Sequence, residues 1–374
     1  MFSICAVFSV IASLRMEQSI PFQANEKKVI SAIFLSILIN LIFFSLSLSL
    51  ILLFNMTIIS FISIEQNNLI LIPFLTFILC MVRIFTSANN YYKSFSKIAI
   101  SKNINSFFTA MSQIILGMMG IKFGLTYGIT FGQFITSIYL FPLNRVKKIF
   151  NVSKKSLKKS LTENRRYIFF DTPAALVDTA SAMAPNFILI FVYSSSVLGY
   201  FSFVERTLFA PLSLIGVSIA QVLTGYAYED FSKQRLFKML INHLKISLLI
   251  LIPVVVVGFF IIEDSYIFIF GTKWTESALY AKWLFPAYLS NIIFTSLSPL
   301  IFILKAQKFS LLFHLILLSI KMFILLFVSE FLQPLDLIKL LSLFIFLSYF
   351  VFTLFLMLLL KRKERQNKCV ELVV

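Results

Sequence analysis

Three cations interrupt long apolar runs of this sequence, where charged residues are rare. They are Arg83, Arg206 and Lys321. A Lys or Arg at the centre of a membrane-spanning helix costs about 2.5–3.5 kcal/mol on insertion scales, so such a side chain normally faces a bundle interior or water. Structural roles are the alternatives. Arg83 and Lys321 can extend toward a membrane surface, and Arg206 can bind carbonyls loosened by Pro211 or pair with Glu205.

Two carboxylates share another apolar run. Asp171 and Asp178 are seven residues apart, which places both on one helical face, about 10 Å from each other. Pro173 lies between them and disturbs the backbone hydrogen bonds. Broken helices that carry acids are typical of cation-binding sites in membranes. Asp178 and Asp171 are therefore candidates for binding a proton or a sodium ion. The alternatives are a hydrogen-bonded helix contact for Asp178 and a helix N-terminal role for Asp171.

Residues that usually hold metals or form disulfides are few and scattered. Cys5, Cys80 and Cys369 lie far apart and form no CxxC pair. His243 and His314 are the only histidines, and two histidines do not make a metal site without further ligands. We expect no metal, no catalytic residue and no cofactor beyond a coupling proton or sodium ion.

The elements that carry these residues are long apolar segments. Hydrophobic residues make up 59% of the chain and charged residues 13%, about half the share in soluble domains. Ten runs approach the roughly 20 residues that a helix needs to cross a bilayer, and none has the period of two of a barrel strand. We predict an all-α polytopic integral membrane protein. The runs are 30–54, 68–86, 103–119, 123–142, 168–193, 197–224, 244–262, 282–304, 309–329 and 336–360.

A shorter apolar segment begins the chain. Residues 1–14, MFSICAVFSVIASL, reach only about 21 Å as a helix, less than the roughly 30 Å of hydrocarbon in a bilayer. They have no basic segment like the one that begins a signal peptide. We therefore expect a partial membrane helix, shortened by a truncated gene or a misplaced start codon.

Charge alternates between the loops. Twenty-six Lys and Arg residues lie in loops on one side, whereas the loops on the other side hold six acids and four lysines. By the positive-inside rule the first side is cytoplasmic. The linker 143–166 and the tail 361–374 are then both cytoplasmic.

The linker concentrates positive charge. The stretch NRVKKIFNVSKKSLKKSLTENRR (144–166) holds nine Lys or Arg and a single acid. Val146, Phe150, Leu157 and Leu161 fall roughly on one helical face, so the segment could lie on the inner leaflet and bind anionic membrane lipids. Nucleic-acid binding is disfavoured because the basic run is short and has few aromatic residues.

The two halves of the chain follow a similar order. Their polar loops recur at an offset of roughly 210 residues on the same side, which is typical of a parallel repeat. We expect two pseudo-symmetric helical lobes with about ten full transmembrane helices plus the partial one. The N-terminal lobe is 1–142, the basic linker 143–166, the C-terminal six-helix lobe 167–360 and the basic tail 361–374.

Half of the ten glycines lie close together. Gly117, Gly120, Gly124, Gly128 and Gly132 recur at three- and four-residue spacing. Small residues at this spacing let two helices approach closely. A phosphate-binding loop is excluded because no GK[ST] follows the glycines.

Three stretches are similar to segments of a known family. RMEQSIPFQANEKKVISAIFLSIL (15–38) resembles its Arg-Tyr-Glu-Gln-Ala-Ile segment, with Met16 in place of Tyr, and 93–133 resembles its fourth to sixth helices. The best-marked region, 165–222, contains GYFSFVERTLFAP and resembles the seventh and eighth helices. The family comprises the O-antigen and exopolysaccharide flippases, polysaccharide-biosynthesis proteins of the multidrug/oligosaccharidyl-lipid/polysaccharide (MOP) exporter superfamily.

The resemblance implies a transporter of the bacterial inner membrane rather than an enzyme. Its members move polyprenyl-diphosphate-linked oligosaccharides by alternating access, so an anionic headgroup must pass between the lobes. Lys321, Arg206 and Arg83 are then candidates for binding that headgroup. A glycan polymerase and other assembly proteins are the implied partners. The sequence departs from the family at Glu205, where Gln is usual, and at the two aspartates, where Ser and Asn are more frequent.

Three other functions compete with this one. A cation-coupled multidrug exporter of the same fold would prefer acids to bases in its cavity. A truncated, inactive remnant is the second. The third, a membrane glycan polymerase, would need catalytic groups on a sizeable outer loop, but the longest, 263–281, contains no His.

Overall fold

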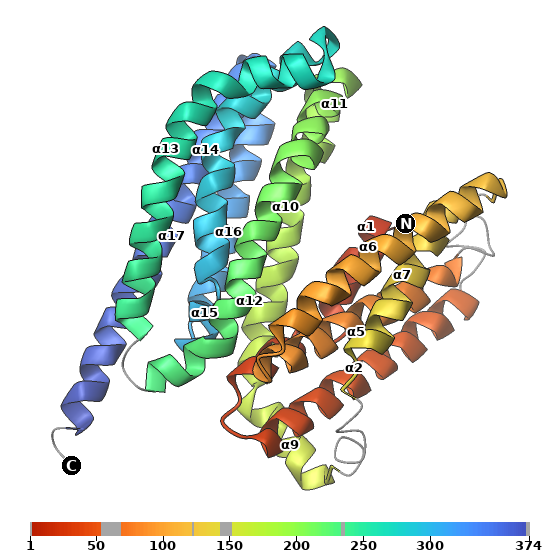
Figure 1. Cartoon of the computed structure of the whole chain (residues 1–374), viewed down its shortest axis with the longest axis vertical. Coiled ribbons are helices and arrows are strands. Elements are labelled where there is room, and N and C mark those ends of the chain that lie inside the picture. Colours follow the sequence, from red (N-terminus) through yellow and green to blue (C-terminus); the bar gives the residue numbers. More distant parts are fainter. Residues whose placement is uncertain (1, 54–68, 122, 143–151, 233–235, 372–374) are drawn as a thin grey trace. The chain divides into compact units, whose positions relative to one another are not determined.

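The computed structural model describes residues 2–53, 69–121, 123–142, 152–232 and 236–371 (Figure 1). Within these ranges the chain is helical and has no strand, which confirms the all-α class. Contacts divide the chain into two compact units, Met1–Leu176 (unit 1) and Val177–Val374 (unit 2).

Eight helices in the described residues are long and apolar enough to cross a membrane. The segments expected at 103–119 and 123–142 are also helical, but the count of ten spans is not confirmed. The first lies in α6 (Phe95–Met118), which is rich in Ser, Asn and Gln. The second, α7 (Gly124–Leu140), has 17 residues and reaches about 26 Å, short of a bilayer core. The eight helices are Glu26–Leu53, Leu71–Tyr91, Tyr167–Val192, Ser195–Gly225, Phe237–Phe270, Thr272–Ile303, Gln307–Phe331 and Pro334–Lys363.

Unit 1 is organised around α5 (Leu71–Tyr91), the helix formed by the second long apolar run. This helix, α5, packs against α1, α2 and α7, and its buried Cys80 and Ile84 join a core with Ile33 of α2. The short α1 is the partial helix expected from residues 1–14. The elements of unit 1, besides α6 and α7, are α1 (Phe2–Ile11), the 3₁₀ turn η1 (Met16–Phe22), α2 (Glu26–Leu53), α5 (Leu71–Tyr91), α9 (Lys154–Glu163) and the π turn η3 (Tyr167–Asp171).

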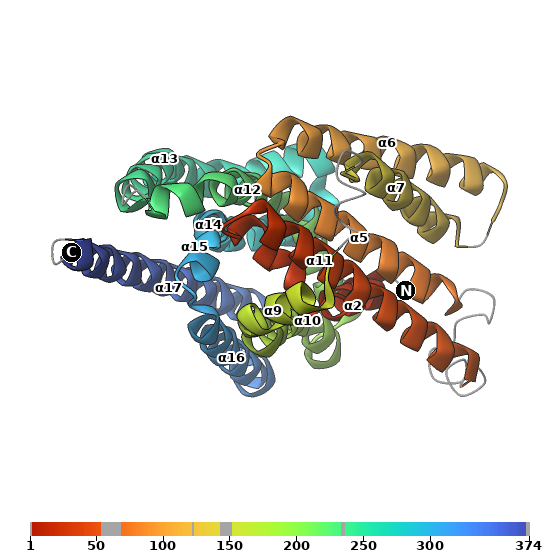
Figure 2. The same ribbon diagram turned by 90° about the horizontal axis from the view of Figure 1, so that it is seen from below.

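Helices α6 and α7 form a close hairpin, visible side by side in Figure 2. A Cβ atom added to Gly132 would lie 3.0 Å from the Asn105 carbonyl oxygen, and one added to Gly128 would lie 3.0 Å from the Gln113 backbone nitrogen. These distances confirm that small residues bring the two helices together. Gly117 has no neighbour within 4 Å of such an atom, so it takes no part in the contact.

Unit 2 is built around α14, which packs against α11, α12, α13 and α17. Buried Tyr280, Leu284 and Leu289 of α14 contribute to its core. Long helices of this unit, among them α13 and α17, run roughly along one direction in Figure 1. Its elements are α10 (Thr172–Val192), α11 (Ser195–Val204), η4 (Glu205–Phe209), α12 (Ala210–Ser232), α13 (Leu236–Phe270), η5 (Thr272–Trp274), α14 (Thr275–Leu297), α15 (Pro299–Ile303), α16 (Gln307–Phe323), η6 (Ile324–Val328), η7 (Ser329–Phe331) and α17 (Pro334–Glu371).

The exterior of unit 2 is strongly apolar. Leu249 is 75% exposed, Phe260 71% and Phe268 89%. Apolar side chains cost nothing against lipid tails, whereas a water-soluble protein rarely exposes such continuous patches. The exposed surface of unit 2 is therefore suited to contact with lipid tails.

The contact-based division falls after Leu176, ten residues beyond the predicted end of the linker. Residues 143–151 of the linker lie outside the described ranges. The remaining part forms α9, which packs against α2 and so belongs to unit 1. The predicted tail 361–374 continues α17 as far as Glu371.

Candidate ion-binding site

A proline inside α10 leaves a carbonyl oxygen without its usual donor. Pro185 has no N–H, so it cannot bond the carbonyl oxygen of Ser181 four residues earlier. The Lys321 ammonium group of α16 donates a hydrogen bond to this oxygen at 2.9 Å. Lys321 has only 7% of its surface exposed. The structure thus places Lys321 inside unit 2, bonded to backbone.

Two acids of unit 2 act electrostatically on Lys321. They are Asp178 on α10 and Glu205 in the π turn η4. The side-chain amide of Asn186 donates to the Glu205 carboxylate at 3.4 Å. Because burying an ammonium is tolerated only with opposite charges and hydrogen bonds nearby, these acids and the Ser181 carbonyl explain how Lys321 is accommodated.

Asp178 also lies beside a histidine. His314 Nδ1 is 3.3 Å from Asp178 Oδ1, within ion-pair distance but without hydrogen-bond geometry. The His314 side chain is 10% exposed and that of Asp178 54% exposed, so the pair is open on the carboxylate side. His314 and Lys321 are seven residues apart on α16, which puts both on the same face, toward α10.

Several buried polar atoms of unit 2 have no hydrogen-bond partner among the described residues. They include Ser181 Oγ, Asn186 Oδ1 and the Tyr288 hydroxyl, besides His314 Nδ1. An unpartnered buried polar atom costs about 1–3 kcal/mol and is rare in native proteins. We call Asp178, Ser181, Asn186, Glu205, His314 and Lys321 the polar cluster of unit 2.

Arg206 follows Glu205 in η4 but is not tied to this cluster. Its side chain is exposed, and no hydrogen bond or ion pair joins it to the described residues. It acts on Glu205 only as a nearby charge. Of the three cations Arg83, Arg206 and Lys321, Arg206 is the one with an exposed side chain.

Asp171 has a different environment from Asp178. Arg15 Nε donates to Asp171 Oδ2 at 2.9 Å, and Asp171 is 5% exposed. Both residues belong to unit 1. The left-handed backbone of Arg15, with φ of 54°, begins the turn η1. The structure therefore does not bring the two predicted carboxylates into one site.

Arg83 belongs to a second buried polar group, also in unit 1. The Arg83 charge interacts electrostatically with those of Glu17 and Arg15. Its Nη1 atom has no hydrogen-bond partner in the described residues. Glu17 is fully buried and accepts a hydrogen bond from Ser13. The stretch RMEQSI thus supplies an ion pair and a buried acid that fix η1 beside α5.

His314 is the residue that sequence reasoning missed. In the sequence, the two histidines suggest at most metal ligands, and the described residues contain no group of three metal-binding side chains. The signal was its spacing from Lys321, since seven residues on one apolar helix place two ionisable groups on one face. Ser181 and Asn186 gave no signal of their own.

Among the comparisons with known proteins, only the comparison with solved structures gives a match, and it concerns the fold. No protein-family model matches the chain, and no curated protein matches it in sequence. Solved structures do match. A MATE protein in the bent conformation gives a TM-score of 0.66 at 14% identity, covering 97% of this chain and 86% of the other.

Two further structures extend this likeness. An outward-facing multidrug resistance MATE transporter of the MOP superfamily gives a TM-score of 0.65 at 11% identity, with 96% of this chain and 85% of the other covered. A MOP superfamily transporter from Pyrococcus furiosus, reported with a binding pocket of reversed polarity that suggests a different function, gives 0.66 at 13% identity with the same coverage. The chain is a multi-pass membrane protein with the fold of the MATE transporters of the MOP superfamily.

Proposed function

We propose that this protein is a transporter that works by alternating access and is driven by protons bound at the Asp178–His314 pair. The fold it shares with MATE transporters supports transport. The carrying observation is the membrane-embedded carboxylate 3.3 Å from an imidazole, beside buried Lys321. Ionisable residues within spans mark ion pathways and proton relays.

The composition of the site favours a proton over a sodium ion. Sodium is a hard cation that is bound by oxygen ligands, whereas His314 and Lys321 both flank Asp178 and carry or accept positive charge. Histidine changes charge between pH 5 and 8, so it suits proton exchange. Two further ionisable groups belong to this electrostatic network: Tyr349 of α17 interacts with Asp178, and Glu205 of η4 interacts with Lys321. Protonation of Asp178 would remove its attraction for His314 and Lys321 of α16 and so loosen α10 from α16.

For the cargo, we propose first a cationic amphipathic compound, exported in exchange for protons. An anionic headgroup would need a buried cation in unit 2, and Lys321 is the candidate. Its ammonium group, however, already binds the Ser181 carbonyl oxygen. The Asp178 side chain is 54% exposed, and when His314 is neutral the two acids Asp178 and Glu205 outnumber the single ammonium of Lys321, so the cluster can attract a cation. The Pyrococcus furiosus transporter supports the idea that pocket polarity selects the cargo in this fold.

A lipid-linked oligosaccharide of the bacterial inner membrane is the second candidate. Exposed Arg206, without an ion pair in the described residues, is suited to an anionic diphosphate headgroup. The three stretches that resemble the polysaccharide flippases, 15–38, 93–133 and 165–222, also favour it. A glycan polymerase would be a partner in this case only.

The coupling proposal is tested in proteoliposomes with the full chain. We expect an acidic lumen to drive ethidium uptake, and Asp178→Asn or His314→Gln to abolish the stimulation, which for a coupling free energy of 1–3 kcal/mol is roughly 5- to 150-fold. His243→Gln is the matched control, because this histidine of α13 contacts Ser296 of α14 and is not part of the polar cluster. Full gradient dependence in Asp178→Asn would refute the proposal.

The cargo is decided in the same vesicles. We expect ethidium to move with the proton gradient and a fluorescent polyprenyl-diphosphate sugar to stay in its leaflet. Flipping of the sugar lipid, lost in Arg206→Gln and kept in Lys305→Gln, would replace the first cargo by the second. No movement of either compound would reject both.

A further inference from the structure

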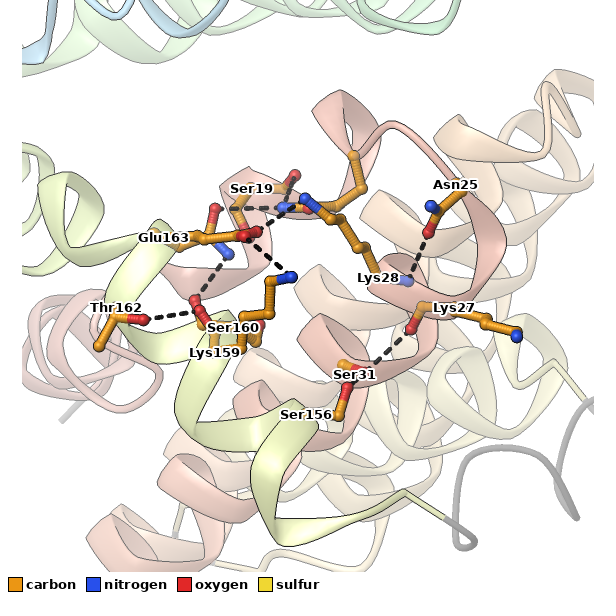
Figure 3. A network of polar contacts seen from close by, with 12 residues as sticks. Ser19, Asn25, Lys27, Lys28, Ser31, Ser156, Lys159, Ser160, Thr162 and Glu163 are labelled. Atoms are coloured by element: carbon orange, nitrogen blue, oxygen red, sulfur yellow. Dashed lines mark hydrogen bonds and ion pairs between the residues drawn. The ribbon is translucent and has the colours of Figure 1, made fainter.

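The linker helix α9 packs against unit 1 through polar contacts (Figure 3). Ser156 Oγ lies 2.7 Å from Ser31 Oγ of α2. Lys28 Nζ donates to Glu163 Oε2 at 2.8 Å, at the other end of α9. The helix is therefore held at both ends against the beginning of α2.

The inward face of α9 is a stripe of small polar residues. Ser156, Ser160 and Asn164 recur every four residues, and Ser160 and Asn164 are buried. Gln23 Nε2 donates to Asn164 Oδ1 at 3.1 Å. Because Ser156 binds Ser31 and Asn164 binds Gln23, the orientation of α9 about its own axis is fixed.

Leu157 and Leu161 belong to the apolar face that the sequence predicts to lie on the inner leaflet. Leu161 is 39% exposed and Leu157 is only partly buried. Val146 and Phe150 lie outside the described residues. The helix turns serines rather than leucines toward the protein because the beginning of α2 offers hydroxyl and charged partners.

The outward face of α9 carries four lysines. Lys154, Lys155, Lys158 and Lys159 are all exposed. At 100° per residue they occupy an arc of about 140°, on the side opposite the serine stripe. The single acid of the helix, Glu163, lies 2.8 Å from Lys28 and 3.9 Å from Lys159, so it balances at most one of the four charges. The surface formed by the four lysines, the lysine face, is thus strongly positive.

The position of α9 beside the beginnings of two candidate spans indicates that the lysine face lies at a membrane surface. The helix rests on the first turns of the span Glu26–Leu53 and ends four residues before the span Tyr167–Val192 begins. Both spans enter the bilayer near α9, so the lysines lie at the level of the lipid headgroups. We propose that the lysine face binds the anionic headgroups of phospholipids in the adjacent leaflet.

Charge complementarity selects this partner. Each lysine near an anionic leaflet contributes a preference of roughly fivefold, and the serine stripe keeps all four on one side. A nucleic acid is a poorer fit, because α9 has no aromatic side chain for stacking. Lipid binding by the lysine face does not depend on which cargo the protein carries, so it can be tested without measuring transport.

The test measures lipid selectivity of the full chain in phosphatidylcholine vesicles. Spin-labelled phosphatidylglycerol or phosphatidylcholine is added, and the lipid immobilised at the protein is quantified. We expect phosphatidylglycerol to be preferred several-fold, and the preference to fall at least threefold when Lys154, Lys155, Lys158 and Lys159 are all replaced by Gln. Replacement of the same four residues by Arg is the matched control and keeps the preference. Equal selectivity in the Gln and Arg variants overturns the proposal.

A second measurement localises the contact in the unaltered protein. Amide hydrogen exchange of residues 153–163 is compared in nanodiscs of phosphatidylcholine with and without phosphatidylglycerol. We expect slower exchange of α9 with the anionic lipid, and loss of the difference in 1 M salt, where charges are screened within about 3 Å. Unchanged exchange of α9, or protection only after addition of RNA or an acidic protein, refutes lipid binding.

Discussion

Lys321 keeps a charge inside unit 2 because Pro185 of a neighbouring helix has left the Ser181 carbonyl free. A carbonyl in hydrocarbon without a donor is costly, and an ammonium without an acceptor is more so. Each group satisfies the other. The acids Asp178 and Glu205 complete the arrangement by balancing the charge.

The first prediction at this scale is a double-mutant cycle between Lys321 and Pro185. We expect Lys321→Met to lower the free energy of unfolding by about 1–3 kcal/mol, because the Ser181 carbonyl loses its donor. In a Pro185→Ala background the restored backbone N–H bonds this carbonyl, so the cost should be smaller by roughly 0.5 kcal/mol or more. Unfolding is followed by steric trapping in bicelles.

The matched control for this cycle is Lys339→Met. Lys339 forms an exposed ion pair with Asp336 at 2.8 Å, and such pairs contribute about 0–1 kcal/mol. Equal costs of Lys321→Met in the two backgrounds would show that the hydrogen bond to Ser181 does not stabilise the protein.

At the scale of elements, the hairpin of α6 and α7 depends on glycine. Gly128 and Gly132 leave room for Gln113 and for the backbone of Asn105, so the helix axes approach closely. In lipid, no hydrophobic driving force brings helices together. Close approach stabilises the pair instead, because it allows dispersion contacts between the two backbones.

We expect Gly132→Ala to destabilise unit 1 by about 1–3 kcal/mol through overpacking. The added methyl group would meet the Asn105 carbonyl oxygen at 3.0 Å and the side chain of Thr109. Gly117→Ala is the control on the same hairpin. It has no neighbour within 4 Å and should stabilise α6 by about 0.4–1 kcal/mol.

Thermal unfolding of the two glycine variants in the same detergent checks this difference. If both variants shift the midpoint in the same direction, the hairpin does not rest on close packing at Gly132. The comparison also separates packing from the loss of glycine flexibility, which is common to both substitutions.

At the scale of the whole molecule, the distribution of charge predicts how the chain lies in the membrane. The lysines of α9 and the basic end of α17 belong to the side with most Lys and Arg, whereas Glu263 and Asp264 belong to the other. The positive-inside rule assigns the first side to the cytoplasm. The proposed lipid contact of α9 would then be with the inner leaflet.

Reporter fusions test this orientation directly. A reporter joined after residue 155 should be active in the cytoplasm, and one joined after residue 270, at the end of α13, should be active outside it. Alkaline phosphatase and green fluorescent protein give complementary readouts. Reporters on the same side would contradict the topology, and an exchange of sides would contradict the orientation.

The sequence by itself determined the class of the protein and the position of its helices. Long apolar runs require helices in lipid, because every backbone group must be bonded within its own segment. The glycine spacing in α6 and α7 likewise predicted close packing, since it is a property of one helix face. Each of these features depends on residues that are near one another in the chain.

Only the tertiary structure decided which ionisable groups meet. Lys321 binds a carbonyl 140 residues away, and Arg15 binds Asp171 156 residues away. Helical periodicity assigns each residue to a face, but it does not say which helix lies opposite that face or at what depth. For this reason the sequence pointed to Lys321 and Asp178 separately, whereas their meeting with His314 came from side-chain contacts between α10 and α16.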